Sequence, residues 1–172
     1  MTMLAANLRA FAAGRALQRE LRWAIEEFNH EYAAVVDRGE IAKWPDFFSE
    51  DAVYRVVARD NAEAGLPLAL MSCEGRGMLK DRAYAIAETE MYAPRYIKHH
   101  ITQIRVTGIE NDFLRAAANY LILETLIDEP TRLLQSGRYE DKFVIEGGNL
   151  LLKERLCIYD TLLVPTCLVF PP

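Results

Sequence analysis

The spacing of apolar residues predicts a long amphipathic helix near the start of the chain. From Leu21 onward these residues recur in steps of four, three, four and three, which places them on one helical face. The face consists of Leu21, Ile25, Phe28, Tyr32, Val35 and Val36. Arg38-Gly39 ends this helix, because glycine is the usual residue just past a helix end. A second, short helix is expected to contain Trp44, Phe47 and Phe48, with Pro45 in its first turn.

Beyond these helices the pattern changes to strands. The composition predicts a short strand at residues 52–58 and a third helix from about Met78 to Tyr92, closed by Pro94. Four long segments rich in β-branched and large apolar residues follow, at 97–107, 114–127, 133–145 and 150–164. Turns fall at residues 108–112, 128–130 and 147–149. We therefore expect one α+β domain over residues 20–172, helices first and a mostly antiparallel sheet after, preceded by an arm or helical extension at 1–19.

The alternation of side chains indicates which faces of this sheet are covered. In the strand from Gly137, one side carries Tyr139, Phe143 and Ile145, interrupted by Asp141, and the other side carries Arg138, Glu140 and Lys142. The last strand is apolar on both faces, so a second subunit is expected to cover one of them. One face has Leu150, Leu152, Leu156, Ile158 and Leu162, and the other has Leu151, Cys157, Tyr159 and Leu163. The apolar tail at 163–172 is expected either to dock on its own domain or to be buried in an assembly.

Composition and charge narrow the class of protein. The chain has 172 residues, of which 51% are apolar and 26% charged, as in a soluble globular domain. Its net charge of -5 argues against nucleic acid or an anionic membrane as the main partner. No window approaches the roughly twenty apolar residues of a membrane span. Arginine outnumbers lysine 15 to 5, which favours a protein partner, because arginine is enriched at protein contacts.

Cysteine and histidine are too sparse to indicate a metal centre. Cys73, Cys157 and Cys167 form no CxxC pair, and an odd number cannot all pair within one chain, so a reduced, cytoplasmic protein is expected. His99 and His100 are adjacent on a strand and point to opposite faces, so they are not expected to bind one ion. The sequence has no GxSxG motif, phosphate-binding loop or dinucleotide fingerprint.

One enzymatic alternative remains open. A curved sheet closed over a helix forms a cone whose mouth can hold a small apolar ligand. His30, Tyr54 and one of His99 or His100 could line it as acid, base and hydrogen-bond donor, as in a dehydratase or isomerase. The other interpretation is that the tyrosines belong to the core and that the histidines make local hydrogen bonds or an interface.

An ordered set of motifs resembles a known family. The segment WPDFFSEDAVYRVV at 44–57, together with Asn61, resembles the β (small) subunits of Rieske-type aromatic-ring-hydroxylating dioxygenases. The resemblance covers about residues 20–172. It continues through GLPLAL at 65–70, MLKDRAYAI at 78–86, YIKHH at 96–100, GRYEDKFV at 137–144 and LKERLCIYD at 152–160.

The resemblance implies a fold and a structural role. The fold is the cystatin-like cone of the nuclear transport factor 2 superfamily. Three β chains would form a base under three α chains, which hold a Rieske [2Fe–2S] cluster and a mononuclear Fe(II). The reaction would be O₂-dependent hydroxylation of a benzoate-type acid such as salicylate, anthranilate or terephthalate. Electrons from NADH would come through a reductase and usually a ferredoxin. The resemblance thus implies no catalytic, cofactor-binding or metal-ligating residue on this chain.

Overall fold

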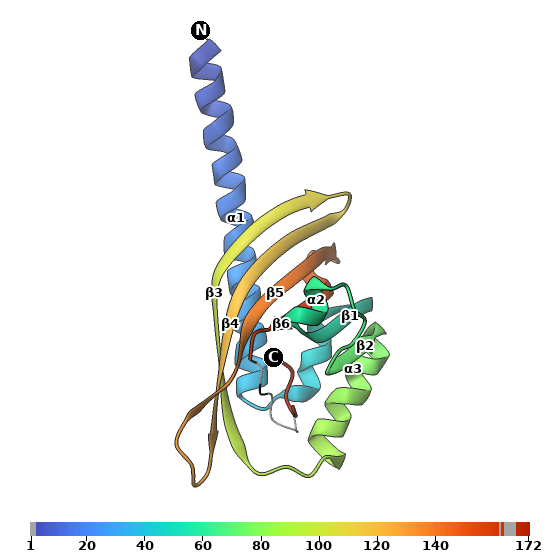
Figure 1. The fold of residues 1–172 in the computed structure, drawn as a ribbon. Coiled ribbons are helices and arrows are strands. Elements are labelled where there is room, and N and C mark those ends of the chain that lie inside the picture. Colours follow the sequence, from blue (N-terminus) through green and yellow to red (C-terminus); the bar gives the residue numbers. More distant parts are fainter. Residues whose placement is uncertain (1–2, 162, 164–167) are drawn as a thin grey trace.

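The predicted amphipathic helix is the first element of the structure. The computed structural model describes residues 3–161, 163 and 168–172, with side chains from residue 14 onward. Helix α1 (Met3–Asp37) is continuous through the segment expected as an arm or extension, and it projects past the sheet (Figure 1). Its predicted apolar face is buried, with Ile25, Tyr32 and Val36 at most 1% exposed. Gly39 adopts a φ of +73°, the left-handed conformation that ends helices.

The chain then makes a short turn of helix and enters the sheet earlier than expected. The 3₁₀ helix η1 (Ile41–Phe47) contains Trp44, and strand β1 (Phe48–Ala58) begins at Phe48. The prediction that Phe48 is helical was therefore wrong. Its backbone is extended, and its ring packs edge-to-face against Trp44 and Tyr54, so burial of the aromatic side chain decides the local conformation.

The connection between β1 and the long strands contains elements that the sequence pattern did not reveal. Helix α2 (Arg59–Glu63) and the edge strand β2 (Met71–Glu74) were not predicted. Strand β2 is four residues long and forms by pairing with β1. The third helix is divided into α3 (Gly75–Tyr84) and a π-helical turn η2 (Ala85–Thr89), so it begins and ends three residues before the predicted bounds.

Four long strands complete the sheet and confirm the predicted segments to within a few residues at most ends. They are β3 (Arg95–Glu110), β4 (Phe113–Leu126), β5 (Arg132–Glu146) and β6 (Asn149–Tyr159). The order in the sheet is β2-β1-β6-β5-β4-β3, and β1 with β6 is the parallel pair. The expected turn between β5 and β6 is present, with positive φ at Gly147 and Gly148.

A bulge in β6 changes which residues face the core. Lys142 pairs with Glu154 and Phe143 pairs with Leu152, so Lys153 is an extra residue in β6. Leu152 therefore faces inward, whereas Leu156, which was predicted on the same face, lies on the outer side beside Glu140. Ile158 is on the outer side as well and is 2% exposed within this chain. Leu162 lies outside the described residues.

The core lies between the concave face of the sheet and the layer formed by α1, η1 and α3 (Figure 1). Edge-to-face aromatic contacts connect the layers: Phe28 of α1 packs against Phe47 and against Phe143 of β5. The last residues of the chain return to this core, with Val169 2% exposed and Pro172 buried. The tail therefore docks on its own domain at residues 168–172, while residues 164–167, including Cys167, lie outside the described residues. The predicted α+β cone of helices on a curved, mostly antiparallel sheet is confirmed.

The close approach of β5 and β6 at Gly137 yields a stability prediction. A Cβ at Gly137 would collide with the main-chain oxygen of Ile158 and would lie 2.8 Å from the Tyr120 hydroxyl oxygen. We expect Gly137→Ala to lower the free energy of unfolding by about 3 kcal/mol in urea denaturation, because both neighbours are fixed by the sheet. The matched control is Gly108→Ala in β3, where the Cβ meets nothing within 4 Å. Equal stabilities of the two variants would contradict the prediction.

Candidate functional site

A buried ion pair occupies the interior of the cone. Arg155 of β6 donates from Nε to Asp141 Oδ1 and from Nη2 to Asp141 Oδ2, both at 2.9 Å. Its Nη2 also donates to Asn29 Oδ1 of α1 at 2.7 Å. The guanidinium carbon lies 4.4 Å from the ring centroid of Tyr32 and 4.2 Å from that of Tyr139. One arginine therefore connects α1, β5 and β6 through hydrogen bonds and two cation–π contacts.

The electrostatics of this site keep the guanidinium charged. Burial by itself lowers the pKa of Arg155, but the adjacent Asp141 carboxylate more than offsets that effect, so the pKa is raised above its ordinary value. Nη1 of Arg155 is also buried and has no hydrogen-bond partner. Asp141 interrupts the apolar side of its strand in the sequence, and this was the one sequence signal for a buried partner. Arg155 was not predicted as part of a site.

Two tyrosines beside this pair donate hydrogen bonds to the end of the described chain. Tyr32 Oη lies 3.1 Å and Tyr54 Oη 3.0 Å from the main-chain oxygen of Pro172. Trp44 Nε1 in turn donates to Tyr32 Oη at 2.9 Å. Burial raises the pKa of Tyr32 to about 12 and raises the pKa of Tyr54 well above its ordinary value. Both phenols are therefore neutral donors near neutral pH, and their donated hydrogens are directed at Pro172.

The residues of the predicted acid–base alternative do not converge. His30 is exposed on α1 with Nδ1 3.7 Å from Glu27 Oε1, and His100 is exposed on the outer face of β3. Tyr54 and His99 both face the interior, but Tyr54 bonds to Pro172 and His99 bonds elsewhere. The structure therefore assembles no pocket from these four side chains, because α1 and the strand alternation separate His30 and His100 from the interior.

His99 forms a buried pair with Asp37, the last residue of α1. Nδ1 of the histidine lies 2.7 Å from Asp37 Oδ1, and the backbone N–H of His99 donates to both carboxylate oxygens at 3.1 and 3.2 Å. His99 Nε2 is buried without a hydrogen-bond partner. Asp37 was not predicted as its partner, since the two residues are 62 positions apart and nothing in the local pattern links them. The pair ties the C-terminal end of α1 to β3.

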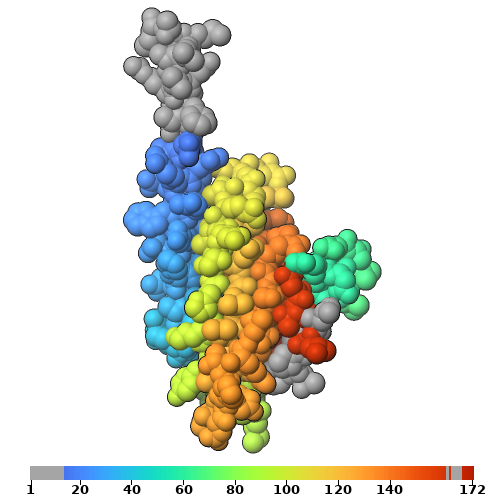
Figure 2. All heavy atoms as spheres, turned by 60° about the vertical axis from the view of Figure 1, so that its left-hand side comes forward, coloured from blue at the N-terminus to red at the C-terminus, as the bar shows by residue number. Residues whose placement is uncertain are grey.

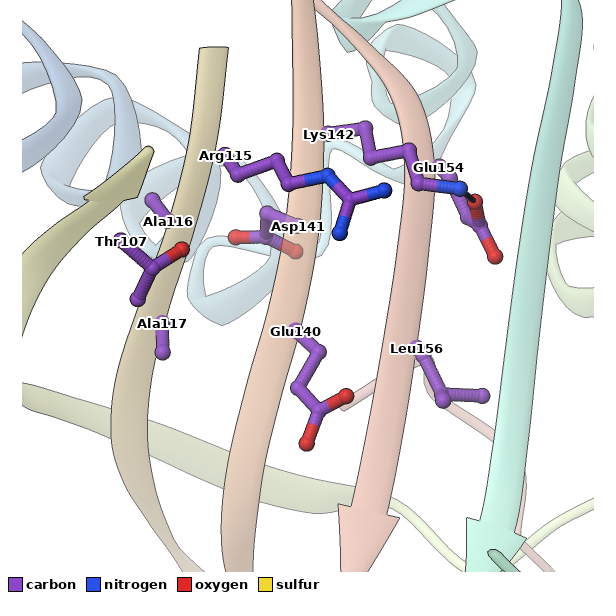
Figure 3. Close-up of a pocket in the computed structure, with 9 residues that line it drawn as sticks. All are labelled: Thr107, Arg115, Ala116, Ala117, Glu140, Asp141, Lys142, Glu154 and Leu156. Atoms are coloured by element: carbon purple, nitrogen blue, oxygen red, sulfur yellow. Dashed lines mark hydrogen bonds and ion pairs between the residues drawn. The ribbon is translucent and has the colours of Figure 1, made fainter. Parts of the chain in front are cut away.

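The outer face of the sheet has a hollow of about 400 Å³ (Figure 3). Its charged side chains are of both signs, and Lys142 pairs with Glu154 across β5 and β6. The lining residues are Thr107, Arg115, Ala116, Ala117, Glu140, Asp141, Lys142, Glu154 and Leu156. Burial raises the pKa of the Asp141 carboxyl, but both of its oxygens accept hydrogen bonds from Arg155 in the interior. The charges that pair at the open surface, Lys142 and Glu154, indicate a surface feature.

The same face carries exposed apolar side chains at the other end of the strands. Tyr96 on β3, Leu121 on β4 and Leu133 on β5 are 72%, 38% and 51% exposed. Strands β3 to β5 form a broad surface beside α1 (Figure 2). Exposed apolar residues on adjacent strands are typical of a protein–protein contact.

The described residues include neither a cluster of metal ligands nor a helix that could span a membrane. In the part of the chain that the structure describes, no group of three or more His, Cys, Asp or Glu side chains is arranged to hold a metal ion. The described residues therefore do not fit a mononuclear iron or an iron–sulfur cluster. Among the same residues, no helix is both long and apolar enough to cross a bilayer.

Comparison with known proteins gives consistent matches. Residues 18–155 match the SnoaL-like domain. The chain is 30% identical over 147 residues to the β1 subunit of the terminal oxygenase component of terephthalate 1,2-dioxygenase from Comamonas, covering 86% of this chain and 96% of that one. It is 28% identical over 142 residues to the anthranilate 1,2-dioxygenase small subunit of Burkholderia cepacia, covering 83% and 88%. A crystal structure assigned as the β subunit of an aromatic-ring-hydroxylating dioxygenase of Novosphingobium aromaticivorans superposes with a TM-score of 0.82 at 37% identity, covering 91% and 99%.

The Arg155–Asp141 ion pair gives a prediction about stability. It distinguishes the cost of leaving one buried charge unpaired from the effect of removing both charges. We expect Arg155→Met to lower the free energy of unfolding by about 3–5 kcal/mol in urea denaturation, because Asp141 is left buried without its counter-charge. The double variant Arg155→Met/Asp141→Leu removes both charges and should recover a substantial part of that loss. A double variant less stable than Arg155→Met alone would contradict this account.

Proposed function

This chain belongs to the β subunits of aromatic-ring-hydroxylating dioxygenases, within the SnoaL-like domain family, and we propose that it is a non-catalytic structural subunit that binds an iron-containing α chain. The observation that carries the proposal is the length of the match: 30% identity covers 96% of a dioxygenase β subunit, and 37% identity covers 99% of a solved one. The interior of the cone supports it, because Arg155 and Asp141 bond to each other and the Tyr32 and Tyr54 hydroxyls bond to Pro172.

The chemistry is proposed to take place on the α subunit. That chain would hold a Rieske [2Fe–2S] cluster and a mononuclear Fe(II), and O₂ would hydroxylate the ring there. NADH would supply electrons through a reductase and usually a ferredoxin. The relatives act on anthranilate and terephthalate, so a benzoate-type acid is the proposed substrate class. Buried free Cys73 and Cys157 accord with a reducing cytoplasm.

The proposed assembly is a trimer of this chain joined to three α subunits. Two features support an assembly. The exposed apolar side chains Tyr96, Leu121 and Leu133 lie on one sheet face, and apolar side chains that gather on one face favour a protein contact. Helix α1 also projects beyond the sheet and carries Trp23, which is 61% exposed (Figure 1). Both surfaces are available for contact with another chain.

Co-expression with its α subunit tests this assignment. We expect the two chains to co-purify on a tag carried by α, and light scattering after size exclusion to give a mass for three copies of each. Leu133→Glu should lower the yield of the complex at least tenfold, because it introduces a charge into the proposed contact. Leu66→Glu, at a 49% exposed position in the loop before β2, serves as the matched control. The proposal would be refuted if this chain is a monodisperse monomer and does not co-purify with its α chain.

Activity provides a separate prediction. His99→Ala removes the buried pair with Asp37 but should leave turnover of the assembled complex within a few-fold of the unsubstituted enzyme. The reason is that the proposed reacting centre lies on the α chain. Turnover per assembled complex is the measurement, with assembly checked by size exclusion. A loss of thousands-fold in a fully assembled complex would place a catalytic residue on this chain.

A further inference from the structure

A groove between helix α1 and the edge strand β3 is lined by arginines. Figure 2 shows α1 running beside β3, and a hollow of about 280 Å³ lies between them. Ile104 and Val106 of β3 form the apolar side of this hollow. Its basic side chains are Arg15, Arg19, Arg22 and Arg105. A second hollow of about 210 Å³ shares Arg22 and Ile104 with the first and extends past Glu26. The two hollows are therefore contiguous, and together they form what we call the arginine groove.

Three arginines of this groove lack the carboxylate partner that later arginines have. From Arg38 onward, every described arginine except Arg105 lies in an ion pair with an aspartate or glutamate. Arg19, Arg22 and Arg105 are exposed and form no ion pair or hydrogen bond with any residue that the structure describes. Glu26 is the one carboxylate among the described residues that line either hollow. Positive charge therefore exceeds negative charge in the groove, although the chain has a net charge of -5, and this favours an anionic partner.

A bulge in β3 gives Arg105 its position in the groove. Relative to β4, strand β3 has one extra residue between Thr102 and Arg105. Gln103 adopts a φ of +54° there, and its Oε1 accepts a hydrogen bond from Asn119 Nδ2 at 2.8 Å. The extra residue reverses the alternation of side chains, so Arg105 is exposed where an uninterrupted strand would turn it toward the core with Ile101. Backbone strain of this kind is concentrated at functional sites, so the bulge is a second indication of a binding surface.

The spacing of the arginines indicates the chemistry of the partner. Arg15, Arg19 and Arg22 recur in steps of four and three, so they lie on one face of α1, about 6 and 4.5 Å apart along its axis. Carboxylates at the same spacing on a partner helix can meet them, and arginine binds a carboxylate through two parallel hydrogen bonds. Ile104 and Val106 can accept an apolar side chain beside these carboxylates. A nucleic acid has no such side chain, and an extended anionic surface would also meet the net negative charge of this chain.

We propose that the arginine groove is a docking site for an acidic amphipathic helix of a partner protein. Carboxylates of that helix, spaced three and four residues apart, pair with the arginines, and an apolar side chain packs against Ile104 and Val106. The groove includes none of the exposed apolar residues Tyr96, Leu121 and Leu133 of the outer sheet face. The proposal therefore goes beyond the subunit contact described above and does not depend on it.

The experiment measures peptide binding to the full chain by fluorescence anisotropy. The probe is a fluorescein-labelled synthetic helix with glutamates in steps of four and three and a leucine on the same face. The control peptide has glutamine in place of each glutamate. We expect the control peptide to bind at least tenfold more weakly at low salt, because the pairing with arginine is lost. Added salt should raise the Kd of the glutamate peptide, since the arginines are exposed and the pairing is screened.

Charge-reversal variants locate the binding. Arg22→Glu should raise the Kd of the glutamate peptide at least tenfold, because Arg22 lines both hollows. The matched control is Lys80→Glu, at an exposed position on α3, which changes the net charge by the same amount and should leave that Kd within twofold. If Arg22→Glu lacks a cooperative thermal transition, Arg105→Gln decides in its place by removing the arginine of β3.

Four outcomes would each overturn the proposal. The first is equal binding of the glutamate and glutamine peptides, and the second is equal weakening by Arg22→Glu and Lys80→Glu. The third is binding to phosphatidylserine vesicles that is tighter than peptide binding and is lost in Arg22→Glu, which would assign the groove to a membrane surface. The fourth is dissociation of oligomers of this chain by Arg22→Glu, observed by sedimentation, which would assign the groove to a second copy.

Discussion

The interior of this protein is organised around one charged group, the guanidinium of Arg155. A charge removed from water is tolerated when it is paired and hydrogen-bonded, so Asp141 and Asn29 must face it at fixed positions. These three residues come from β6, β5 and α1. The pair therefore constrains the register of β5 against β6, and it also fixes how α1 lies across the concave face. The rings of Tyr32 and Tyr139 on either side then follow, since both lie against the same guanidinium.

This arrangement explains why the same cone can be a structural subunit. General acid–base catalysis needs a titratable group within hydrogen-bond reach of a substrate. Here Asp141 is bonded to Arg155, Asp37 is bonded to His99, and the tyrosines are bonded to Pro172. Asp141, Asp37 and the two tyrosines thus hold elements of the fold together, while His99 is bonded through Nδ1 and its Nε2 has no hydrogen-bond partner. The fold by itself does not decide between the two roles, so the assignment depends on how these particular side chains are used.

The parts of the fold that were predicted correctly depend on local pattern. The apolar face of α1, the four long strands and the glycine turn at 147–148 each have a signal within a few residues of sequence. Strand β2 and the bulge at Lys153 were missed, because pairing with β1 and β5 decides them and that pairing is not local. The His99–Asp37 contact was missed for the same reason. In the site, the position of Asp141 on an apolar face was visible in the sequence, but its partner was not.

The bulge in β6 also relocates the surface on which a partner chain is expected. In a regular strand without this bulge, residues 150–164 would carry apolar side chains on both faces of the sheet. That pattern led to the expectation that another subunit covers one of the two faces. With the bulge, Leu152 turns inward, and Ile158 is already covered by its own chain. The apolar side chains that stay exposed on the outer face, Tyr96, Leu121 and Leu133, lie instead on β3 to β5. Because water is removed from such groups at a stable interface, the contact with a neighbouring subunit is expected at β3 to β5 and not at β6.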